Sequence, residues 1–363
     1  MTRCAVPVVR TASTYTILGF VGYGVASLGA ALLFVAWHLP LVDRLIAAFA
    51  PPLALLAVVR TVSAIRGVER IVFYQVAATG VIVAGVVDRL AGTQPARVLD
   101  VVTLGIGVFL VFGRLGCFAV ACCHGRPARL GVVYGAAHVD VGFWARWRGR
   151  RLWPTQLVES AASLALVVAG LVLGWNQPGR PAVIYIAGYA MIRFALELVR
   201  GDAARPQRLG LSEAQWIAPA TVTACAIWQP GWPTFGAALA LWLAAALLVA
   251  RREARALLAP PHLHELDQRC HDATRSQARA ETSLGVSVSR HDLPDGRIDW
   301  VLSCDRPTWS PAAAHRLADL LWPHHALVAG RLPGVVHVLV DPSTDHGPTR
   351  SEAGSLDRAG GAP

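Results

Sequence analysis

Lysine is absent from this chain of 363 residues, so all 33 basic residues are arginines. Charge of either sign is also scarce, because charged residues make up 15% of the sequence and apolar residues 54%. This composition excludes an ordinary soluble globular protein, in which about 25% of residues are charged. The net charge of +10 does not indicate nucleic-acid binding, because the arginines are spread over the segments between apolar blocks.

Cysteine is also scarce, and the seven cysteines are odd in number and scattered. That pattern excludes the disulfide framework of a small secreted protein. The first apolar block, residues 15–37, is too long for a signal-peptide core and is not followed by a small-residue cleavage site. We therefore expect it to remain as a membrane helix.

Apolar blocks near the roughly 20 residues needed to cross a bilayer recur through the first 250 residues. They lie at 15–37, 45–59, 71–87, 101–123, 160–175, 181–192 and 214–250. The last block is broken at Gln229-Pro230-Gly231-Trp232-Pro233, which predicts two helices and a tight turn. Pro51-Pro52 leaves a kinked span and a re-entrant segment as alternatives for the second block. The sequence predicts eight spans.

The composition changes beyond Arg251, where Arg, His, Asp and Pro become frequent. Alternation at 283–290, a turn at 293–296 and a further apolar run at 298–303 predict a β-hairpin. A helix is expected after Ser310, through 321, and a third strand at 335–340. We predict an all-α polytopic membrane protein with a small α+β C-terminal soluble domain, divided as 1–254, 255–342 and a disordered tail at 343–363.

Arg114 lies inside the otherwise uncharged run 101–123, within Gly113-Arg114-Leu115-Gly116-Cys117. An arginine at the centre of a spanning helix costs about 2.5 to 3.5 kcal/mol even by the lower estimates. A charge at that depth is by default a functional candidate that faces a protein-lined cavity.

Two further polar clusters lie at the ends of apolar blocks. Arg193, Glu197 and Arg200 share one helical face, where the glutamate can hold the guanidinium groups and leave donors for a phosphate. The alternative is a helix end whose arginines reach the interface. Gln156 and Glu159 precede the block at 160, where they either complete a polar site or serve ordinary helix-start chemistry.

In this order and spacing, the clusters resemble the prolipoprotein diacylglyceryl transferase family. The resemblance covers roughly residues 97–223. It is carried by Leu99-Asp100, Gly113-Arg114-Leu115-Gly116, Pro154-Thr155-Gln156-Leu157 with Glu159, Arg193-Phe194 with Glu197 and Arg200, and Leu211-Ser212 with Gln215, while Tyr15 matches a tyrosine of the first span.

The resemblance implies transfer of the diacylglyceryl group of phosphatidylglycerol to the cysteine thiol of a prolipoprotein, with release of glycerol phosphate. It implies that Arg114 and Arg193 stabilise the leaving phosphate, with Glu197 orienting them. We expect no cofactor. Membrane lipids and the precursor are the expected partners, nucleic acid is not, and the location is the bacterial cytoplasmic (inner) membrane. The expected substrate contacts are Tyr15, Gln75, Gly116, Cys117, Cys122, His124, Gln156, Glu159 and Arg200.

The chain departs from the family pattern at several positions. Gln75 stands where the family has a histidine, and glutamine cannot act as a base near neutral pH. Cys117, Cys122 and Trp153 replace an asparagine, a glutamate and a histidine, and His124 is the nearby residue that could compensate. The alternative function is therefore a catalytically altered or inactive member that binds an anionic phospholipid or modifies a different acceptor.

Cys117, Cys122, Cys123 and His124 lie within eight residues. Their spacing does not match the paired Cys-x-x-Cys arrangement of structural zinc, so no metal site is predicted. Small thiols that pack near a helix end are favoured, and a Cys117–Cys122 disulfide stays open if the helix breaks there.

Two arguments disagree on orientation. The arginine-rich segments, 126–151 above all, fall on the same side as both chain ends, and the positive-inside rule places that side in the cytoplasm. The family resemblance implies that the same segment faces outward.

Overall fold

The computed structural model describes residues 14–49, 95–203 and 207–343, with single positions between 53 and 90. Within these ranges, five helices are long and apolar enough to cross a membrane. They are α1 (Thr14–Ala36), α4 (Pro95–Ala119), α6 (Thr155–Gly174), α7 (Arg180–Val199) and α9 (Trp232–Ala250). The chain is therefore a multi-pass membrane protein, as predicted.

The predicted spans differ in how far the structure describes them. Residues 41–49 are helical, whereas most of the block at 45–59 and nearly all of 71–87 lie outside the described residues. The block at 214–250 does form two helices, but α8 (Glu213–Trp228) has only 16 residues and holds Pro219 in its interior. The count of eight spans stays a prediction.

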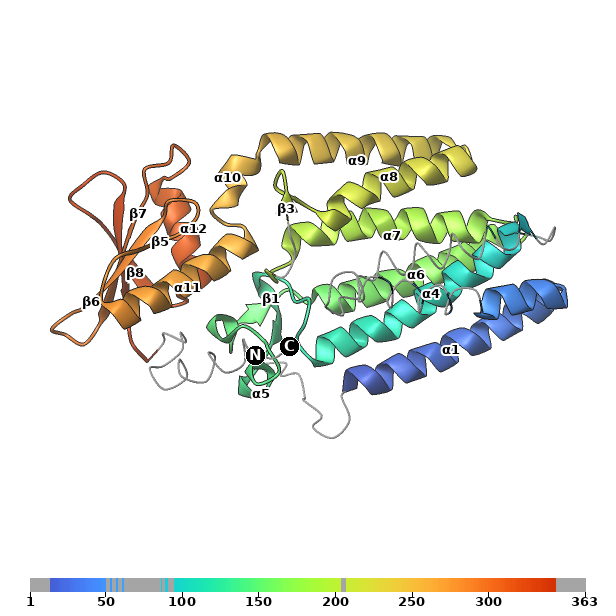
Figure 1. Ribbon diagram of the computed structural model, residues 1–363, viewed down its shortest axis with the longest axis horizontal. Helices are drawn as coiled ribbons and strands as arrows, with labels where there is room; N and C mark the ends of the chain where they lie inside the picture. The colour runs from blue at the N-terminus through green and yellow to red at the C-terminus, as the bar shows by residue number, and fades with distance from the viewer. Residues whose placement is uncertain are drawn as a thin grey trace.

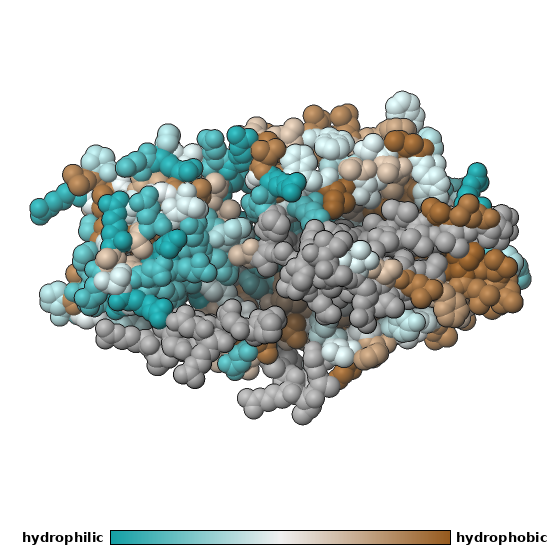
Figure 2. Space-filling view, in the orientation of Figure 1, coloured by the Kyte–Doolittle hydropathy of each residue, from teal (hydrophilic) through white to brown (hydrophobic). Residues whose placement is uncertain are grey.

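The helices lie side by side as a bundle, and the soluble part extends from one end of it (Figure 1). Figure 2 shows hydrophilic residues gathered over that part and hydrophobic residues over much of the bundle. Large apolar side chains on the bundle are exposed, including Phe20 at 73% and Trp232 at 91%. In a bilayer such side chains face acyl chains, which is what a spanning bundle requires.

Helix α4 occupies the middle of the described bundle, against α1, α6 and α7. Small residues permit the close approach, because a Cβ at Gly107 would lie 2.5 Å from the Tyr185 ring and 2.7 Å from Val167. The Ser163 hydroxyl donates to the Gly107 carbonyl oxygen at 3.0 Å across the same contact. Small residues and interhelical hydrogen bonds are the usual means of helix association in membranes.

At the end of the bundle far from the C-terminal part, Asp100 joins α4 to α7. Its fully buried carboxylate accepts hydrogen bonds from the amides of Gly179 at 2.9 Å and Ala182 at 3.0 Å. These amides belong to the first turn of α7, whose donors have no partner within the helix. Asp100 of α4 therefore caps α7 from a neighbouring helix.

Two loop regions lie at the other end. The α4–α6 connection holds the antiparallel strands β1 (Pro127–Val133) and β2 (Arg151–Leu152), with α5 (Ala136–Val139) and a 3-10 turn at Ala145–Trp147 between them. We call residues 120–154 the signature loop. After α7, β3 (Gln207–Arg208) pairs with β4 (Leu211–Ser212), and Ser212 caps α8 in a capping box with Gln215.

The C-terminal part begins with α10 (Arg252–Ala256) and α11 (Pro260–Ser276). A five-stranded antiparallel sheet follows, in the order β5-β6-β7-β9-β8, with α12 (Pro311–Leu321) before β8. The strands are β5 (Ala280–Glu281), β6 (Ser287–Asp292), β7 (Ile298–Ser303), β8 (His325–Ala329) and β9 (Val335–Val340).

The predicted hairpin, third strand and Ser310-capped helix are confirmed, although β6 begins four residues later than expected. Helix α11 and strands β5 and β8 were not predicted. The C-terminal part is thus a small α+β domain, and its boundaries at 255 and 342 stay predictions. The tail at 343–363 lies outside the described residues except for its first position.

The C-terminal domain is docked onto the signature loop. Arg146 pairs with Asp267 of α11 through Nη2 at 2.5 Å, and Trp144 Nε1 donates to the same carboxylate at 2.7 Å. Trp147, fully buried, donates to the Leu320 carbonyl oxygen at 2.9 Å. Tyr134 and Trp147 share one hydrophobic cluster with Leu263 and other residues of the domain. Loop and domain therefore lie on the same side of the membrane.

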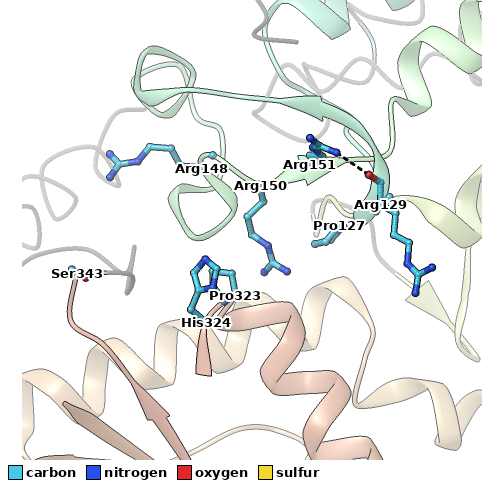
Figure 3. A pocket seen from close by; sticks show the side chains of 10 residues that line it. Pro127, Arg129, Arg148, Arg150, Arg151, Pro323, His324 and Ser343 are labelled. Carbon is cyan, nitrogen blue, oxygen red and sulfur yellow. Dashed lines mark hydrogen bonds between the residues drawn. The ribbon is translucent and has the colours of Figure 1, made fainter. Parts of the chain in front are cut away.

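A cavity of about 650 Å³ opens along this contact (Figure 3). Its lining is basic, with Arg129, Arg148, Arg150 and Arg151 from the loop and His324 from the domain. Arg150 is committed to the contact, because it donates to the carbonyl oxygens of Asp319 and Leu320 at 2.7 and 2.6 Å.

Candidate functional site

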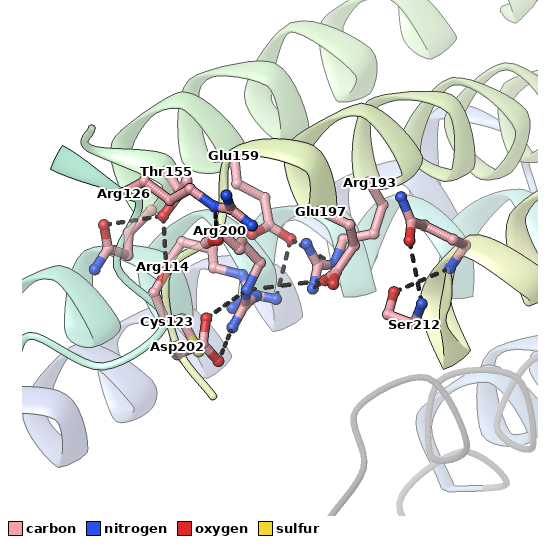
Figure 4. A network of polar contacts seen from close by, with 12 residues as sticks. Arg114, Cys123, Arg126, Thr155, Glu159, Arg193, Glu197, Arg200, Asp202 and Ser212 are labelled. Atoms are coloured by element: carbon pink, nitrogen blue, oxygen red, sulfur yellow. Dashed lines mark hydrogen bonds and ion pairs between the residues drawn. The ribbon is translucent and has the colours of Figure 1, made fainter. Parts of the chain in front are cut away.

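Four charged side chains meet where three spanning helices reach the signature loop (Figure 4). They are Arg114 near the end of α4, Glu159 near the start of α6, and Arg193 and Glu197 near the end of α7. Their side chains are 8%, 2%, 1% and 6% exposed. The helices place them at one level because α4 and α7 run toward the loop and α6 runs away from it.

Glu159 is the centre of this cluster. Its Oε1 lies 3.0 Å from Arg114 Nη2 and 3.8 Å from Arg193 Nε, and it accepts a hydrogen bond from the Tyr189 hydroxyl at 2.7 Å. A buried carboxylate needs such partners, because desolvation of an unpaired charge is expensive. One carboxylate thus fixes the guanidinium groups of two helices.

Glu197 holds the second half of the network. It pairs with Arg193 Nη2, and its Oε1 lies 3.8 Å from Arg200 Nε. Arg200 also donates to both oxygens of Asp202, at 2.8 Å each. Burial lowers the pKa of Arg200, but Cys123 and Asp202 outweigh it and hold that pKa above its ordinary value. The carboxylate that contacts Arg114 is Glu159, which the prediction of Glu197 as orienter of both arginines did not include.

One N–H group of the Arg114 guanidinium remains available to a ligand. Within the described part of the chain, its buried Nε has no hydrogen-bond partner. Buried polar groups are nearly always satisfied, so an orphaned donor on a charged side chain needs an explanation. A forked guanidinium with a spare N–H suits a phosphate oxygen.

Gln156 and Thr155 hold the turn that follows α4. The Gln156 amide donates to the Cys122 carbonyl oxygen at 2.7 Å, and the Thr155 hydroxyl donates to that of Cys123 at the same distance. Gln156, 1% exposed, also lies 3.3 Å from the Tyr134 hydroxyl. The contacts of Gln156 are therefore with the Cys122 backbone and with the hydroxyls of Thr155 and Tyr134.

Tyr15 and Gly116 come together as one contact between α1 and α4. A Cβ at position 116 would lie 3.0 Å from Tyr15 Cδ2 and 3.2 Å from its Cα. Glycine thus permits close approach of α1 here, beside Arg114. Gln75 lies outside the described residues.

The His124 ring lies between Phe143 and Trp147, with centroids 5.1 and 5.5 Å away. Its Nδ1 is 3.0 Å from the Gly125 carbonyl oxygen. Burial lowers the pKa of His124, so the ring is neutral at pH 7. Its expected contact with substrate stays a prediction.

The sulfur atoms of Cys117, Cys122 and Cys123 lie within 4.8 Å of one another. All three cysteines are free, so the Cys117–Cys122 disulfide left open by the sequence is not formed. His124 is not a member of this thiol group.

Tyr189 and Asp202 belong to the site although neither was predicted. Tyr189, Arg193 and Glu197 are spaced four apart on α7, so a search along that helical face would have found the tyrosine. Asp202 lies two residues beyond Arg200, where no periodicity marks it.

Comparison with known proteins identifies a matching family. Residues 11–225 match the family model of prolipoprotein diacylglyceryl transferase. A phosphatidylglycerol--prolipoprotein diacylglyceryl transferase of Clostridium tetani (strain Massachusetts / E88) is 30% identical over 131 residues, which is 35% of this chain and 49% of that protein. A phosphatidylglycerol--prolipoprotein diacylglyceryl transferase 2 of Clostridium perfringens (strain 13 / Type A) is 30% identical over 125 residues. These residues are 32% of this chain and 45% of that protein.

The chain spans about half the length of the curated relatives it matches. The family match is broader, because it covers more than half of this chain and includes α1, α4, α6 and α7 with all four charged residues. The chain belongs to the prolipoprotein diacylglyceryl transferase family.

Proposed function

We propose that this protein transfers the diacylglyceryl group of phosphatidylglycerol to the cysteine thiol of a prolipoprotein in the bacterial cytoplasmic membrane. The observation that carries the proposal is the buried ion pair Arg114–Glu159, in which Glu159 also lies near Arg193. The Nε of Arg114 has no hydrogen-bond partner among the described residues and can donate to a ligand. The names of the relatives suggest the substrates. The paired guanidinium groups and the N–H of Arg114 without a partner support recognition of a phosphate.

The chemistry needs charge stabilisation more than proton transfer at the phosphate. As the bond between the glycerol carbon and the phosphate oxygen breaks, negative charge grows on the leaving glycerol phosphate. Preorganised guanidinium donors in a water-poor site stabilise such charge strongly. Glu159 contributes by holding Arg114 and Arg193 in place before substrate arrives.

The formal charge of the network also suits a phosphodiester. Arg126 joins the site through a 3.1 Å hydrogen bond from its Nε to the Arg200 carbonyl oxygen. Four guanidinium groups and three carboxylates then give the network a formal charge of +1, which one phosphodiester would neutralise. The members are Arg114, Arg126, Arg193, Arg200, Glu159, Glu197 and Asp202 (Figure 4).

The test is complementation of a bacterium depleted of its own transferase, with transfer to a prolipoprotein measured in its membranes. The wild-type chain is expected to restore growth. Arg114→Ala is expected to reduce transfer by about 10²-fold or more, the usual cost of one transition-state donor. Arg180→Ala is the matched control, because this exposed arginine at the far end of α7 is hydrogen-bonded to Gln177 and lies away from the charged cluster.

A second candidate is a member that binds an anionic phospholipid without transfer, or that modifies a different acceptor. It is favoured by Gln75, Cys117 and Cys122, which stand where the family has other polar residues. Failure of the well-expressed wild-type chain to lipidate any prolipoprotein, together with Arg114-dependent binding of phosphatidylglycerol, would favour this candidate over the first.

A further inference from the structure

The three free thiols are gathered by an unusual turn. Helix α4 ends at Ala119, and Ala121 and Cys123 then both adopt a φ of 57°, a left-handed conformation that residues with a side chain rarely adopt. The Cys122 amide donates to the Cys117 carbonyl oxygen at 3.1 Å, which folds the chain back on the helix end. Such a strained conformation persists only where surrounding structure fixes it.

Hydrogen bonds from α6 hold the backbone of this turn, and the three sulfur atoms lie next to one another. Thr155 and Gln156 of α6 donate to the carbonyl oxygens of Cys123 and Cys122. Cys117 is 8% exposed, and the other two are partly buried. The thiol group is therefore a fixed, sheltered set of three soft ligands.

The same group lies beside the phosphate site. Cys117 follows Arg114 by three residues on α4. The Cys123 carbonyl oxygen accepts a 2.7 Å hydrogen bond from Thr155, which lies four residues before Glu159 on α6. Whatever binds the sulfurs is thus adjacent to the donors proposed for the leaving phosphate.

We propose that Cys117, Cys122 and Cys123 form a three-thiolate zinc site whose fourth position takes the acceptor thiol. Zinc–sulfur bonds of about 2.3 Å place tetrahedral ligands about 3.8 Å apart, so the sulfurs at 4.8 Å or less need only small side-chain adjustments. Three protein ligands with an open fourth position are the arrangement of catalytic zinc, in contrast to the closed four-ligand structural site.

The role of the acceptor rests on the proposed function. Coordination removes the proton of the precursor thiol to solvent, since a metal-bound thiol is deprotonated. The thiolate sulfur then attacks the glycerol carbon and forms the thioether bond. The carbon–oxygen bond breaks, and its electron pair leaves with glycerol phosphate. Zinc thereby supplies the thiol activation that Gln75 cannot, and no oxidant or reductant is needed.

Metal binding is measured first, on the purified full chain in detergent. We expect about one Zn²⁺ per chain, and Co²⁺ in its place should show sulfur-to-metal charge-transfer absorption. Cys117→Ser, Cys122→Ser and Cys123→Ser should each weaken Zn²⁺ binding by about 100-fold or more. Cys225→Ser, which alters a buried thiol of α8 outside the group, should bind as the wild type does.

Acceptor binding is measured next, by adding a signal-peptide segment with its cysteine or with serine in that place. Only the cysteine peptide should change the Co²⁺ spectrum. Unaltered metal binding in all three cysteine variants, or full transfer by a metal-free chain, would overturn the zinc site while leaving the proposed transferase intact. A three-cysteine zinc site on a chain that transfers nothing would uphold the metal site and refute the transferase.

Discussion

At the scale of single residues, Glu159 supplies the carboxylate that pairs with the buried Arg114. Glu159→Gln would leave Arg114 with a neutral partner in a nearly dry site, whereas Arg193 would keep its ion pair with Glu197. Removing one member of a buried ion pair costs about 3 to 5 kcal/mol, so we expect a clear loss of thermal stability in detergent. Glu213→Gln, on an exposed glutamate at the start of α8, is the control. Equal melting temperatures for the two variants would contradict the central role of Glu159.

The sequence located these residues but not all of their pairings. Arg193 and Glu197 are four apart on one helix, so their ion pair was predictable and is confirmed. Arg114 and Glu159 lie on different helices, and their contact depends on how deeply α4 and α6 overlap. That relative register is set by packing such as Gly107 on Val167, which no local pattern encodes.

At the scale of elements, the close packing of α4 is the feature most sensitive to small changes. Gly107→Ala would place a Cβ 2.5 Å from the Tyr185 ring, whereas Gly105→Ala on the same helix meets nothing within 4 Å. Overpacking typically costs about 1 to 3 kcal/mol, so we expect Gly107→Ala to lower the melting temperature and reduce transfer. Gly105→Ala should change neither. A Gly107→Ala protein as stable as Gly105→Ala would show that α4 can shift freely.

Helices and strands were predicted correctly where one sequence pattern was strong. Long uncharged runs marked the spanning helices, and the alternation before and after Asp295-Gly296 marked the hairpin β6–β7. Helix α11 was missed because its composition is strongly polar. Its buried positions, Leu263, Leu266, Cys270 and Ala273, nevertheless follow helical spacing and would have identified it.

At the scale of the whole molecule, the docked domain constrains the membrane topology. The signature loop and α11 are joined by contacts of 2.5 to 2.8 Å, so reporters inserted at Gly149 and after Arg255 should report the same compartment. Reporters on opposite sides would contradict the docking. The side itself distinguishes the positive-inside expectation from the outward orientation that acceptance of exported precursors requires.

Docking should also weaken in acid. The His264 ring stacks on Trp144 with centroids 3.8 Å apart, and burial lowers the pKa of His264 from 6.5 to about 4. The undocked ring takes up a proton below about 6.5 while the docked ring stays neutral. The contribution of the neutral His264 ring to the stability of the docked state is therefore complete above that pH. It is lost as the pH falls toward about 4, and the loss amounts to roughly 3 kcal/mol at most.

The measurement is thermal unfolding of the full chain from pH 7 to 4.5. His264→Phe keeps an aromatic ring against Trp144 but cannot titrate, so it should reduce the pH dependence. Some dependence should remain, because burial also lowers the pKa of His124 and His262. An unchanged slope in His264→Phe would exclude this histidine as a source of acid sensitivity.

The docking also imposes an order on biosynthesis. Trp147 is fully buried, and part of its cover comes from the region of Leu320, which is synthesised more than 170 residues later. A ribosome that has just released the signature loop has not yet made the surface on which that loop rests. The contacts of Arg146 and Trp147 with the C-terminal domain therefore form only after nearly the whole domain has been synthesised and has reached the same side of the membrane.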